Sequence, residues 1–357
     1  MDFPYVSTKV EGITQEFDLS SPTGRHEYFH AKAGKEIEDL KEYLDKASFV
    51  SFWLAKKQAG KGTYTKMFTE LVGEDRVKHI SVGDIVRHVH EALENPQEKD
   101  ALYAYLQSHY RGPLTIEQAF DALLNRTTQT LLPSEFILSL VKREVEQLNG
   151  EAILMDGFPR GLDQISYSLY FREIMNLRND PDFFVLIDVP NSVLDARMKN
   201  RVICPLCHTS RSPRLFTTKS VGYDKEKNEF YLLCDNSSCE GFDKERLVAK
   251  EGDELGIEGI RERLEGDENL IKHTALLQGV DKIKLRNTIP VDKSEELVDH
   301  YEVTPEYIYT YNEKTGEVTT STKPWIIEDH DGTPSYSLLA PAVVLSFIKQ
   351  LHKLLIE

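Results

Sequence analysis

The sequence predicts an α/β fold in which helices cover both faces of a parallel β-sheet. Short apolar runs alternate along the chain with helical segments; these runs are Ser48–Ala55, Val77–Ser81, Ala152–Asp156 and Phe183–Val189. Strands that are apolar at nearly every residue are typical of parallel sheets buried on both sides. Strands that alternate with helices favour the same architecture.

Two stretches interrupt this alternation, and we expect each to be an inserted subdomain. Residues 83–133 are polar and helical, and residues 202–256 contain all four cysteines. The core is then expected to consist of residues 48–82, 134–201 and 257–357.

Within the last core segment, residues 280–323 are expected to be an inserted region. Residues 306–321 alternate in residue type around an Asn-Glu-Lys-Thr-Gly turn, which predicts a β-hairpin. The chain then reaches Pro324–Asp329, a candidate last strand, and an amphipathic helix from Leu338.

Residues 1–47 precede the first strand, and we expect them to form an N-terminal extension. Turn-forming residues such as the run Ser-Ser-Pro-Thr-Gly occur in its first part, and a helix is predicted over Lys35–Lys46.

The composition limits the partners of the chain. Its 357 residues carry a net charge of −16, which repels a nucleic-acid backbone, so we expect no nucleic-acid partner. The N-terminus lacks the basic start and apolar run of a signal peptide, and no apolar stretch approaches membrane-spanning length. We therefore expect a cytoplasmic protein without a membrane partner, and a monomer.

A candidate phosphate-binding loop follows the first strand and consists of Ala59, Gly60, Lys61, Gly62 and Thr63. Glycines let backbone N–H groups converge on phosphate oxygens, the helix N-terminus adds positive potential, and the lysine adds a full charge. Ala55 and Gln58 stand where glycine is usual, and a side chain there would crowd the loop. An ordinary strand-to-helix turn is the alternative interpretation.

Three further segments follow the next strands in order: Ser81–Arg87, then Asp156-Gly157-Phe158-Pro159-Arg160, then the arginines at 197 and 201. With the Gly-Lys-Gly-Thr loop, they resemble the motifs of adenylate kinase and its relatives, the nucleoside monophosphate kinases. The resemblance covers roughly residues 48–277 and returns near 324–352. It implies a three-layer P-loop NTPase fold with a five-stranded parallel sheet, a helical acceptor-binding insertion and a zinc-ribbon-like lid.

The resemblance also implies a reaction, direct in-line transfer of a phosphoryl group from ATP to a nucleoside monophosphate, with AMP the favoured acceptor and ADP the product. The implied catalytic residues are Lys61, Asp156, Arg160, Arg197, Arg201 and Arg263. The implied ATP contacts are residues 59–63 and Arg197, and the implied acceptor contacts are Val82, Arg87, Gly157, Arg160 and Gln164. Asp84 and Asp156 are implied to hold Mg²⁺ through water.

Several of these residues have a second interpretation. Arg197 and Arg201 are four residues apart, so on a helix they would share one face, which could instead be a solvated basic surface. Asp84 could cap a helix. Arg263 matches the family's second lid arginine. Its companion, normally about a turn or more earlier in the chain, is not evident, and Lys250 is the candidate replacement.

The identity of the acceptor depends on two residues. Gln164 occupies the position from which adenylate kinases read the adenine edge of AMP. Val82 replaces their threonine and lacks its hydroxyl, and UMP/CMP enzymes of the family carry alanine there. A kinase for UMP or CMP therefore remains the alternative.

The cysteines form two close pairs, Cys204 with Cys207 and Cys234 with Cys239. Four thiolates can close a tetrahedral zinc site, so we expect a structural Zn²⁺ in the lid, with free buried thiols as the alternative. Two other hypotheses stay open for the whole chain. One is a non-catalytic nucleotide sensor, suggested by Ala55 and Gln58, and the other is a zinc-ribbon nucleic-acid binder, which the acidic net charge disfavours.

Overall fold

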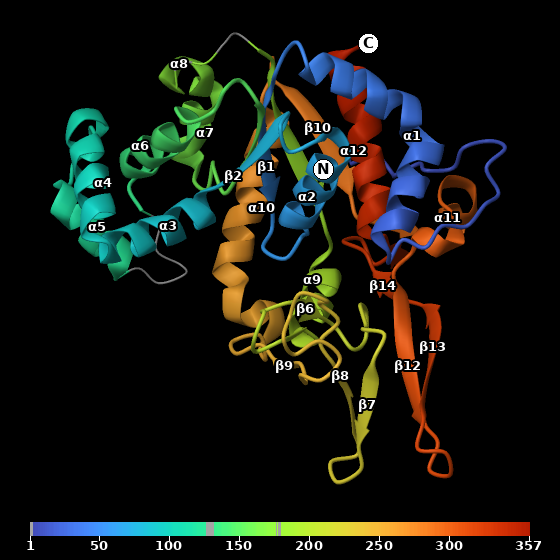
Figure 1. The fold of residues 1–357 in the computed structure, drawn as a ribbon. Helices are drawn as coiled ribbons and strands as arrows, with labels where there is room; N and C mark the ends of the chain where they lie inside the picture. The colour runs from blue at the N-terminus through green and yellow to red at the C-terminus, as the bar shows by residue number, and fades with distance from the viewer. Residues whose placement is uncertain (1–2, 126–131, 176, 178–179) are drawn as a thin grey trace.

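The computed structural model describes residues 3–125, 132–175, 177 and 180–357, and a five-stranded β-sheet lies at its centre (Figure 1). The strand order is β10-β4-β1-β3-β2, and every neighbouring pair is parallel. The strands are β1 (Val50–Ala55), β2 (Val77–Ser81), β3 (Ala152–Asp156), β4 (Asp182–Asp188) and β10 (Asp281–Arg286). The predicted fold class is confirmed.

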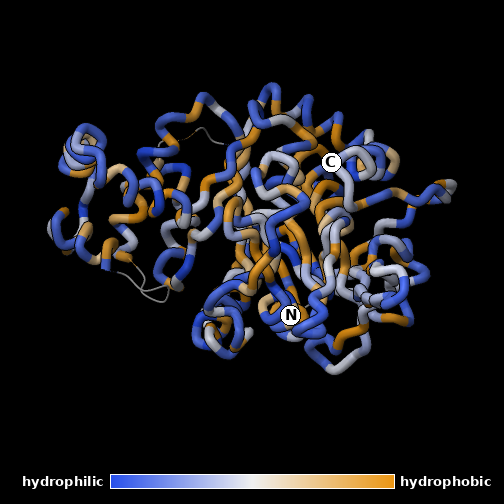
Figure 2. Tube along the Cα trace, turned by 60° about the horizontal axis from the view of Figure 1, so that its bottom comes forward, coloured by the Kyte–Doolittle hydropathy of each residue, from blue (hydrophilic) through white to orange (hydrophobic). Residues whose placement is uncertain are grey.

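Helices cover both faces of this sheet, so the fold has three layers. Trp53 of β1 faces one hydrophobic core, whereas Phe52 and Leu54 face the other, and all three are fully buried. The first core includes α1 (Pro22–Leu44), α2 (Lys61–Val72), α9 (Asn191–Lys199) and α12 (Ala340–Leu355). The second includes α6 (Ser134–Val145), α7 (Leu162–Leu169), α8 (Phe171–Met175) and most of the apolar face of α10 (Arg261–Leu276). Apolar residues concentrate around the sheet (Figure 2).

The N-terminal helix begins earlier than the sequence predicted. We expected a helix over Lys35–Lys46, but α1 spans Pro22–Leu44. Ser21 caps it by accepting the backbone N–H of Gly24, and Pro22 occupies the first turn, where its missing N–H is not needed. The run interpreted as a turn is therefore the start of a helix, which packs along α12.

The insertion after β2 is helical, as predicted, and contains α3 (Val82–Glu94), α4 (Pro96–His109) and α5 (Ile116–Leu124). These helices join the second core through residues such as Leu102, Leu106 and Phe120. The expected boundary at residue 133 follows residues 126–131, which lie outside the described part of the chain.

The prediction of the last strand was wrong. The segment Pro324–Asp329 contributes only β14 (Ile326–Glu328), which belongs to a separate antiparallel sheet with β11 (Thr288–Pro290) and β15 (Pro334–Ser337). The fifth core strand is β10, inside the region 280–323 that we expected to be inserted. As an edge strand, β10 alternates buried Ile283 and Leu285 with lysines, so it lacks the continuous apolar run of the central strands.

Two hairpins project side by side beyond the carboxyl end of the sheet (Figure 1). One, β7 (Val221–Asp224) with β8 (Glu229–Leu232), belongs to the cysteine-containing lid, together with β5 (Val202–Ile203), β6 (Ser210–Arg211) and β9 (Val248–Ala249). The other is the predicted hairpin, observed as β12 (Pro305–Tyr311) and β13 (Val318–Pro324). Shorter elements are η1 (Gly256–Ile260), α11 (Val291–Leu297) and η2 (His300–Glu302). In the described residues, every helix is too short or too polar to span a bilayer.

Candidate active site

The predicted phosphate loop lies where β1 turns into α2. Gly60 has a φ of 103°, and a Cβ atom at this residue would lie 2.9 Å from the ring of Tyr64, so the loop requires glycine here. Among the described residues, no side chain caps the N-terminus of α2. The first N–H groups of the helix therefore remain available to an anion.

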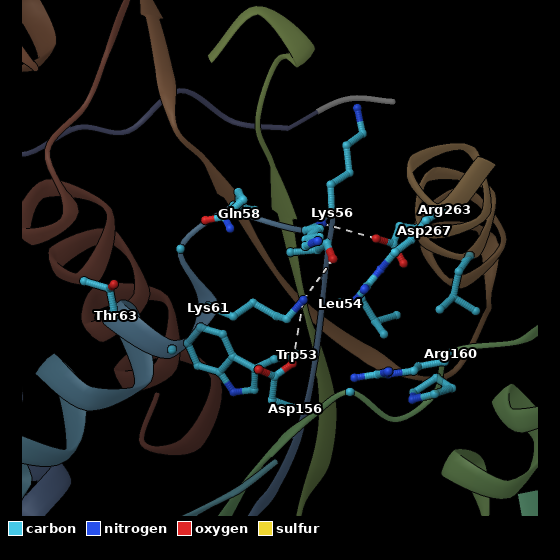
Figure 3. Close-up of a pocket in the computed structure, with 18 residues that line it drawn as sticks. Trp53, Leu54, Lys56, Gln58, Lys61, Thr63, Asp156, Arg160, Arg263 and Asp267 are labelled. Atoms are coloured by element: carbon cyan, nitrogen blue, oxygen red, sulfur yellow. Dashed lines mark hydrogen bonds and ion pairs between the residues drawn. The ribbon is translucent and has the colours of Figure 1, made fainter. Parts of the chain in front are cut away.

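A cavity of about 440 Å³ opens between this loop, the end of β3 and α10. Lys61 donates to the backbone oxygen of Ala55 (2.9 Å), and its Nζ lies 3.6 Å from Oδ1 of Asp156. Arg160 and Arg263 line the other side of the cavity (Figure 3). The structure thus brings together residues from three separate sequence motifs, and Gly157 lines the same cavity.

Asp267 of α10 also lines this cavity, and sequence reasoning missed it. Its Oδ2 accepts the backbone N–H of Lys57 at 3.2 Å, so the carboxylate anchors the phosphate loop to α10. Burial raises the pKa of Asp267, while Lys61 and Arg263 act in the opposite direction. Asp267 lies one helical turn after Arg263 and on the same face of the helix. This spacing could have identified it from the sequence as a second residue facing the site.

Several cations converge around the loop. Burial lowers the pKa of Lys57, and the positive charges of Arg263, Arg201 and Lys250 lower it further. Asp253 partly offsets them. Such a concentration of positive charge in an acidic protein is a local site for an anion, and a polyphosphate has the matching charge.

Arg197 and Arg201 both contact Gln58, but they do not share a helix face as expected. Helix α9 ends at Lys199, so Arg201 lies beyond it. Arg197 donates to the backbone oxygen of Gln58 and to Oδ1 of Asn287, each at 3.2 Å. Arg201 forms an ion pair with Asp253, and in the amide orientation that satisfies both groups it donates to the side-chain oxygen of Gln58.

The acceptor-side residues lie at the start of α3 and of α7. Ser81, rather than Asp84, caps α3 by accepting the N–H of Asp84, and Asp84 forms an ion pair with Arg87. The interpretation of Asp84 as the cap was therefore wrong. Val82, in the first turn of α3, is buried.

Gln164 is buried and its amide is engaged on both sides. Its oxygen accepts the backbone N–H of Arg160 (2.8 Å), and its nitrogen donates to the hydroxyl of Ser134 (2.9 Å). It lines a second cavity of about 380 Å³, between α6 and α7. One N–H and one oxygen lone pair of this amide remain for a base.

The four cysteines converge in the lid, where their Sγ atoms all lie within 4.8 Å of one another. The Sγ atoms of Cys204 and Cys239 are 4.0 Å apart, and those of Cys207 and Cys234 are 3.7 Å apart. Zn–S bonds of about 2.3 Å in a tetrahedron place sulfur atoms about 3.8 Å apart, so the cluster fits this metal. Hydrogen bonding with the side chain and backbone of Thr209 lowers the pKa of the Cys207 thiol to about 5, which favours the thiolate that binds zinc.

Comparison with curated proteins identifies kinases as relatives, although no protein-family model matches the chain. The adenylate kinase of Petrotoga mobilis is 31% identical over 149 residues, which are 42% of this chain and 56% of the relative. That of Thermotoga petrophila is 25% identical over 251 residues, or 70% of this chain and 84% of the relative. The "Probable UMP-CMP kinase 2" of Arabidopsis thaliana is 27% identical over 158 residues, which are 44% of this chain and 49% of the relative. The match thus spans little more than half of the Petrotoga protein.

Proposed function

We propose that this chain, whose relatives include adenylate kinases and a probable UMP-CMP kinase, is a nucleoside monophosphate kinase that transfers a phosphoryl group from ATP to a nucleoside monophosphate. The observation that carries the proposal is the convergence of Lys61, Asp156, Arg160 and Arg263 on one cavity beside the phosphate loop. We propose AMP as the acceptor, so that two molecules of ADP are formed.

Positioning and charge stabilisation explain how such a site acts. Phosphoryl transfer needs little covalent chemistry from the protein, because an in-line arrangement and neutralisation of the equatorial oxygens are enough. Lys61 and the N–H groups of α2 would hold the donor phosphates. Arg160 and Arg87 would hold the acceptor phosphate, and Arg197, Arg201 and Arg263 would surround the transferring group.

The cofactor residues are part of the same proposal. Asp156 lies at the end of β3 with its carboxylate toward Lys61 and the cavity, a donor that fits Mg²⁺ held through water. Asp84 fits the same role only when its ion pair with Arg87 opens. Magnesium bound with ATP supplies neutralisation of phosphate charge. In the lid, the cysteine cluster is suited to a structural Zn²⁺ that fixes the local fold.

UMP or CMP is the second candidate acceptor, for two reasons. Val82 lacks the hydroxyl of the threonine that it replaces, and the amide of Gln164 already makes one hydrogen bond at each end, with Arg160 and Ser134. The relative from Arabidopsis is named a probable UMP-CMP kinase. Gln164 supports AMP, since its remaining N–H and oxygen lone pair can pair with the adenine edge.

The test is turnover of the purified full chain with ATP, magnesium and, separately, AMP, CMP, UMP and GMP, with the diphosphates quantified by chromatography. Turnover with AMP and with none of the other acceptors supports the proposal in full. Formation of CDP or UDP supports the second candidate. Absence of product with every acceptor overturns the kinase proposal. If no acceptor is phosphorylated but calorimetry shows that ATP binds, the result indicates a nucleotide sensor. Gln58, a non-glycine residue with a positive φ in the loop, favours that alternative.

A further inference from the structure

Asn287 lies at the end of β10, and its side chain joins four parts of the chain. It is fully buried, and all of its hydrogen-bonding capacity is used. Its oxygen accepts from Arg197 (3.2 Å) and from the hydroxyl of Ser337 (2.9 Å), and its nitrogen donates to the hydroxyl of Tyr64 (3.2 Å) and the backbone oxygen of Leu338 (3.1 Å). Arg197 belongs to α9 and Tyr64 to α2. Ser337 is the last residue of β15, and Leu338 follows it.

We propose that Asn287 is a positioning residue that orients the Arg197 guanidinium toward the phosphate loop. The Arg197 guanidinium donates to the backbone oxygen of Gln58 and to the amide oxygen of Asn287. The Asn287 side chain cannot rotate away without losing three other hydrogen bonds. A guanidinium that is already fixed in its binding position loses less conformational entropy when it binds a phosphate or a base. This inference rests on the proposed function, because it assigns Arg197 to the ATP site.

The test is a double-mutant cycle between Asn287→Ala and Arg197→Ala, read as the dissociation constant of ATP by calorimetry, which does not require turnover. Each single variant should weaken ATP binding about tenfold, and the double variant should be no weaker than Arg197→Ala alone. Ser335→Ala removes a buried hydroxyl of the same strand, β15, that bonds to Thr333 and not to Asn287, so it is the matched control and should bind ATP like the native chain.

Asn287→Asp covers the case in which Asn287→Ala does not fold. It keeps an oxygen for Arg197 and can accept from the hydroxyl of Tyr64, so it should retain ATP affinity within about threefold while losing the bond to Leu338. Additive effects of Asn287→Ala and Arg197→Ala would overturn the proposal, as would loss of affinity in Asn287→Asp equal to that in Arg197→Ala. If native ATP binding is intact but no acceptor is phosphorylated, only the kinase proposal fails.

A separate observation concerns the hairpin β12–β13, whose place in the proposed function is so far unexplained. Tyr307, Tyr309 and Tyr311 occupy alternate positions of β12, so they lie on one face of the strand. These three are half-buried, whereas Ile308 and Thr310 between them are exposed. The tyrosine face is therefore covered by another part of the molecule.

The lid covers this face. The backbone N–H of Tyr307 donates to the backbone oxygen of Arg214 (2.8 Å), and the hydroxyl of Tyr309 donates to that of Thr217 (2.7 Å). Tyr309 also packs against the apolar cluster that contains the cysteines. The ring of Tyr311 stacks on that of Tyr223, with centroids 4.3 Å apart.

An ion pair strengthens this contact at the base of the hairpin. Nε of Arg214 lies 2.7 Å from Oε1 of Glu306, and the guanidinium of Arg214 lies over the ring of Trp325. The contacts thus extend along the whole of β12. The other strand of the hairpin, β13, runs directly into β14 of the sheet β11–β15–β14, so each contact joins the lid to the core.

We propose that the hairpin β12–β13 is a strap that ties the lid to the core, so that the lid moves away from the hairpin only when the tyrosine contacts break. Lid movement governs the exclusion of water and the release of product in phosphoryl-transfer enzymes, so such a strap would limit it. This proposal rests on the proposed function, because it takes residues 202–256 to be the lid of a nucleotide kinase.

Hydrogen–deuterium exchange of the full chain tests the strap without requiring catalysis. The variant Tyr309→Ala with Tyr311→Ala should increase exchange at residues 213–233 about tenfold while leaving the strands of the central sheet unchanged. Ile308→Ala with Thr310→Ala, on the exposed face of the same strand, is the matched control and should exchange like the native chain. Tyr309→Phe keeps the ring and should give an intermediate increase.

Unchanged exchange at residues 213–233 in the tyrosine variant would overturn the strap, as would an equal increase in the control. An equal increase in the central sheet would show general destabilisation instead and would also overturn it. If exchange behaves as expected but no acceptor is phosphorylated, the strap stands as a conformational tie and only the kinase proposal fails.

Discussion

The backbone oxygen of Gln58 accepts a hydrogen bond from Arg197, with 3.2 Å between the two atoms, and Gln58 makes this contact from a left-handed conformation with a φ of 69°. Glycine adopts that conformation without a steric penalty, whereas a residue with a Cβ atom does not. The side chain of Gln58 turns toward Arg201. The loop therefore keeps its shape at a conformational cost.

We predict that Gln58→Gly is more stable than Gln58→Ala by about 0.5–1 kcal/mol. Both variants lose the side-chain contact with Arg201, so their difference isolates the left-handed backbone, which costs about 1–2 kcal/mol for a non-glycine residue and is partly offset by the greater freedom of glycine in the unfolded chain. Denaturant-induced unfolding measures the difference. Equal stability, or a more stable alanine variant, would contradict the strain at this residue.

Lys61→Met should lower the rate of phosphoryl transfer by roughly 10²–10³-fold, because it removes the charge nearest the proposed phosphate site. Lys66→Met is the matched control, since Lys66 lies on the same helix with its side chain 77% exposed. It should retain native activity. Steady-state diphosphate formation gives both rates, and an equal loss in the two variants would refute the special role of Lys61.

The bond between Asp267 and the N–H of Lys57 should stabilise the phosphate loop. Asp267→Ala removes the acceptor of this partly buried N–H, so we expect it to lower the free energy of unfolding by about 1–2 kcal/mol. Asp267→Asn keeps an oxygen acceptor and should lose less than half as much. Thermal or denaturant unfolding distinguishes the two, and identical losses would show that the hydrogen bond is not the cause.

Cys204→Ser should abolish stoichiometric zinc, because a closed four-sulfur site loses a ligand. Elemental analysis of the purified chain checks this directly. Ser238→Ala, in the exposed turn between Cys234 and Cys239, leaves the sulfur atoms in place and should retain the metal. A native chain without zinc would exclude the structural metal altogether.

The central sheet and much of the site were predictable because their signals are local. Central strands of a parallel sheet are apolar on both faces, so β1, β3 and β4 appear as continuous apolar runs. The loop with Lys61 and the segment with Asp156 and Arg160 follow such strands directly, and the carboxyl ends of parallel strands meet at one edge of a sheet. Their convergence in one cavity follows from the topology.

The remaining features depend on contacts between segments distant in sequence. The edge strand β10 alternates lysines with apolar residues, so it lacks the continuous apolar run by which the central strands were predicted. Helix α1 begins at a serine–proline cap, and the same residues are typical of a turn. Asp267 and Asn287 belong to no recognised motif, and their roles come from the groups that the fold places beside them. The tyrosine alternation of β12 was visible as a strand pattern, but its partner, the lid, was not.

The final prediction concerns pH. Nε2 of His330, in the turn after β14, lies 2.8 Å from Oδ1 of Asp188 at the end of β4, and this contact raises the pKa of His330 above its ordinary value of 6.5. Asp329 acts in the same direction, whereas burial and Lys56 oppose it. A raised folded-state pKa means that the folded chain holds the proton more tightly than the unfolded chain.

The stability contributed by His330 is therefore fully present below pH 6.5 and is lost as the pH rises through the higher folded-state pKa. His330→Gln should destabilise the chain more at pH 5.5 than at pH 8.5, as measured by denaturant unfolding at each pH. In an Asp188→Asn background the same substitution should have a much weaker pH dependence, because the carboxylate that raises the pKa is gone. A loss that is larger at pH 8.5 would have the wrong sign, and a dependence that persists unchanged without Asp188 would assign the effect to other groups near His330.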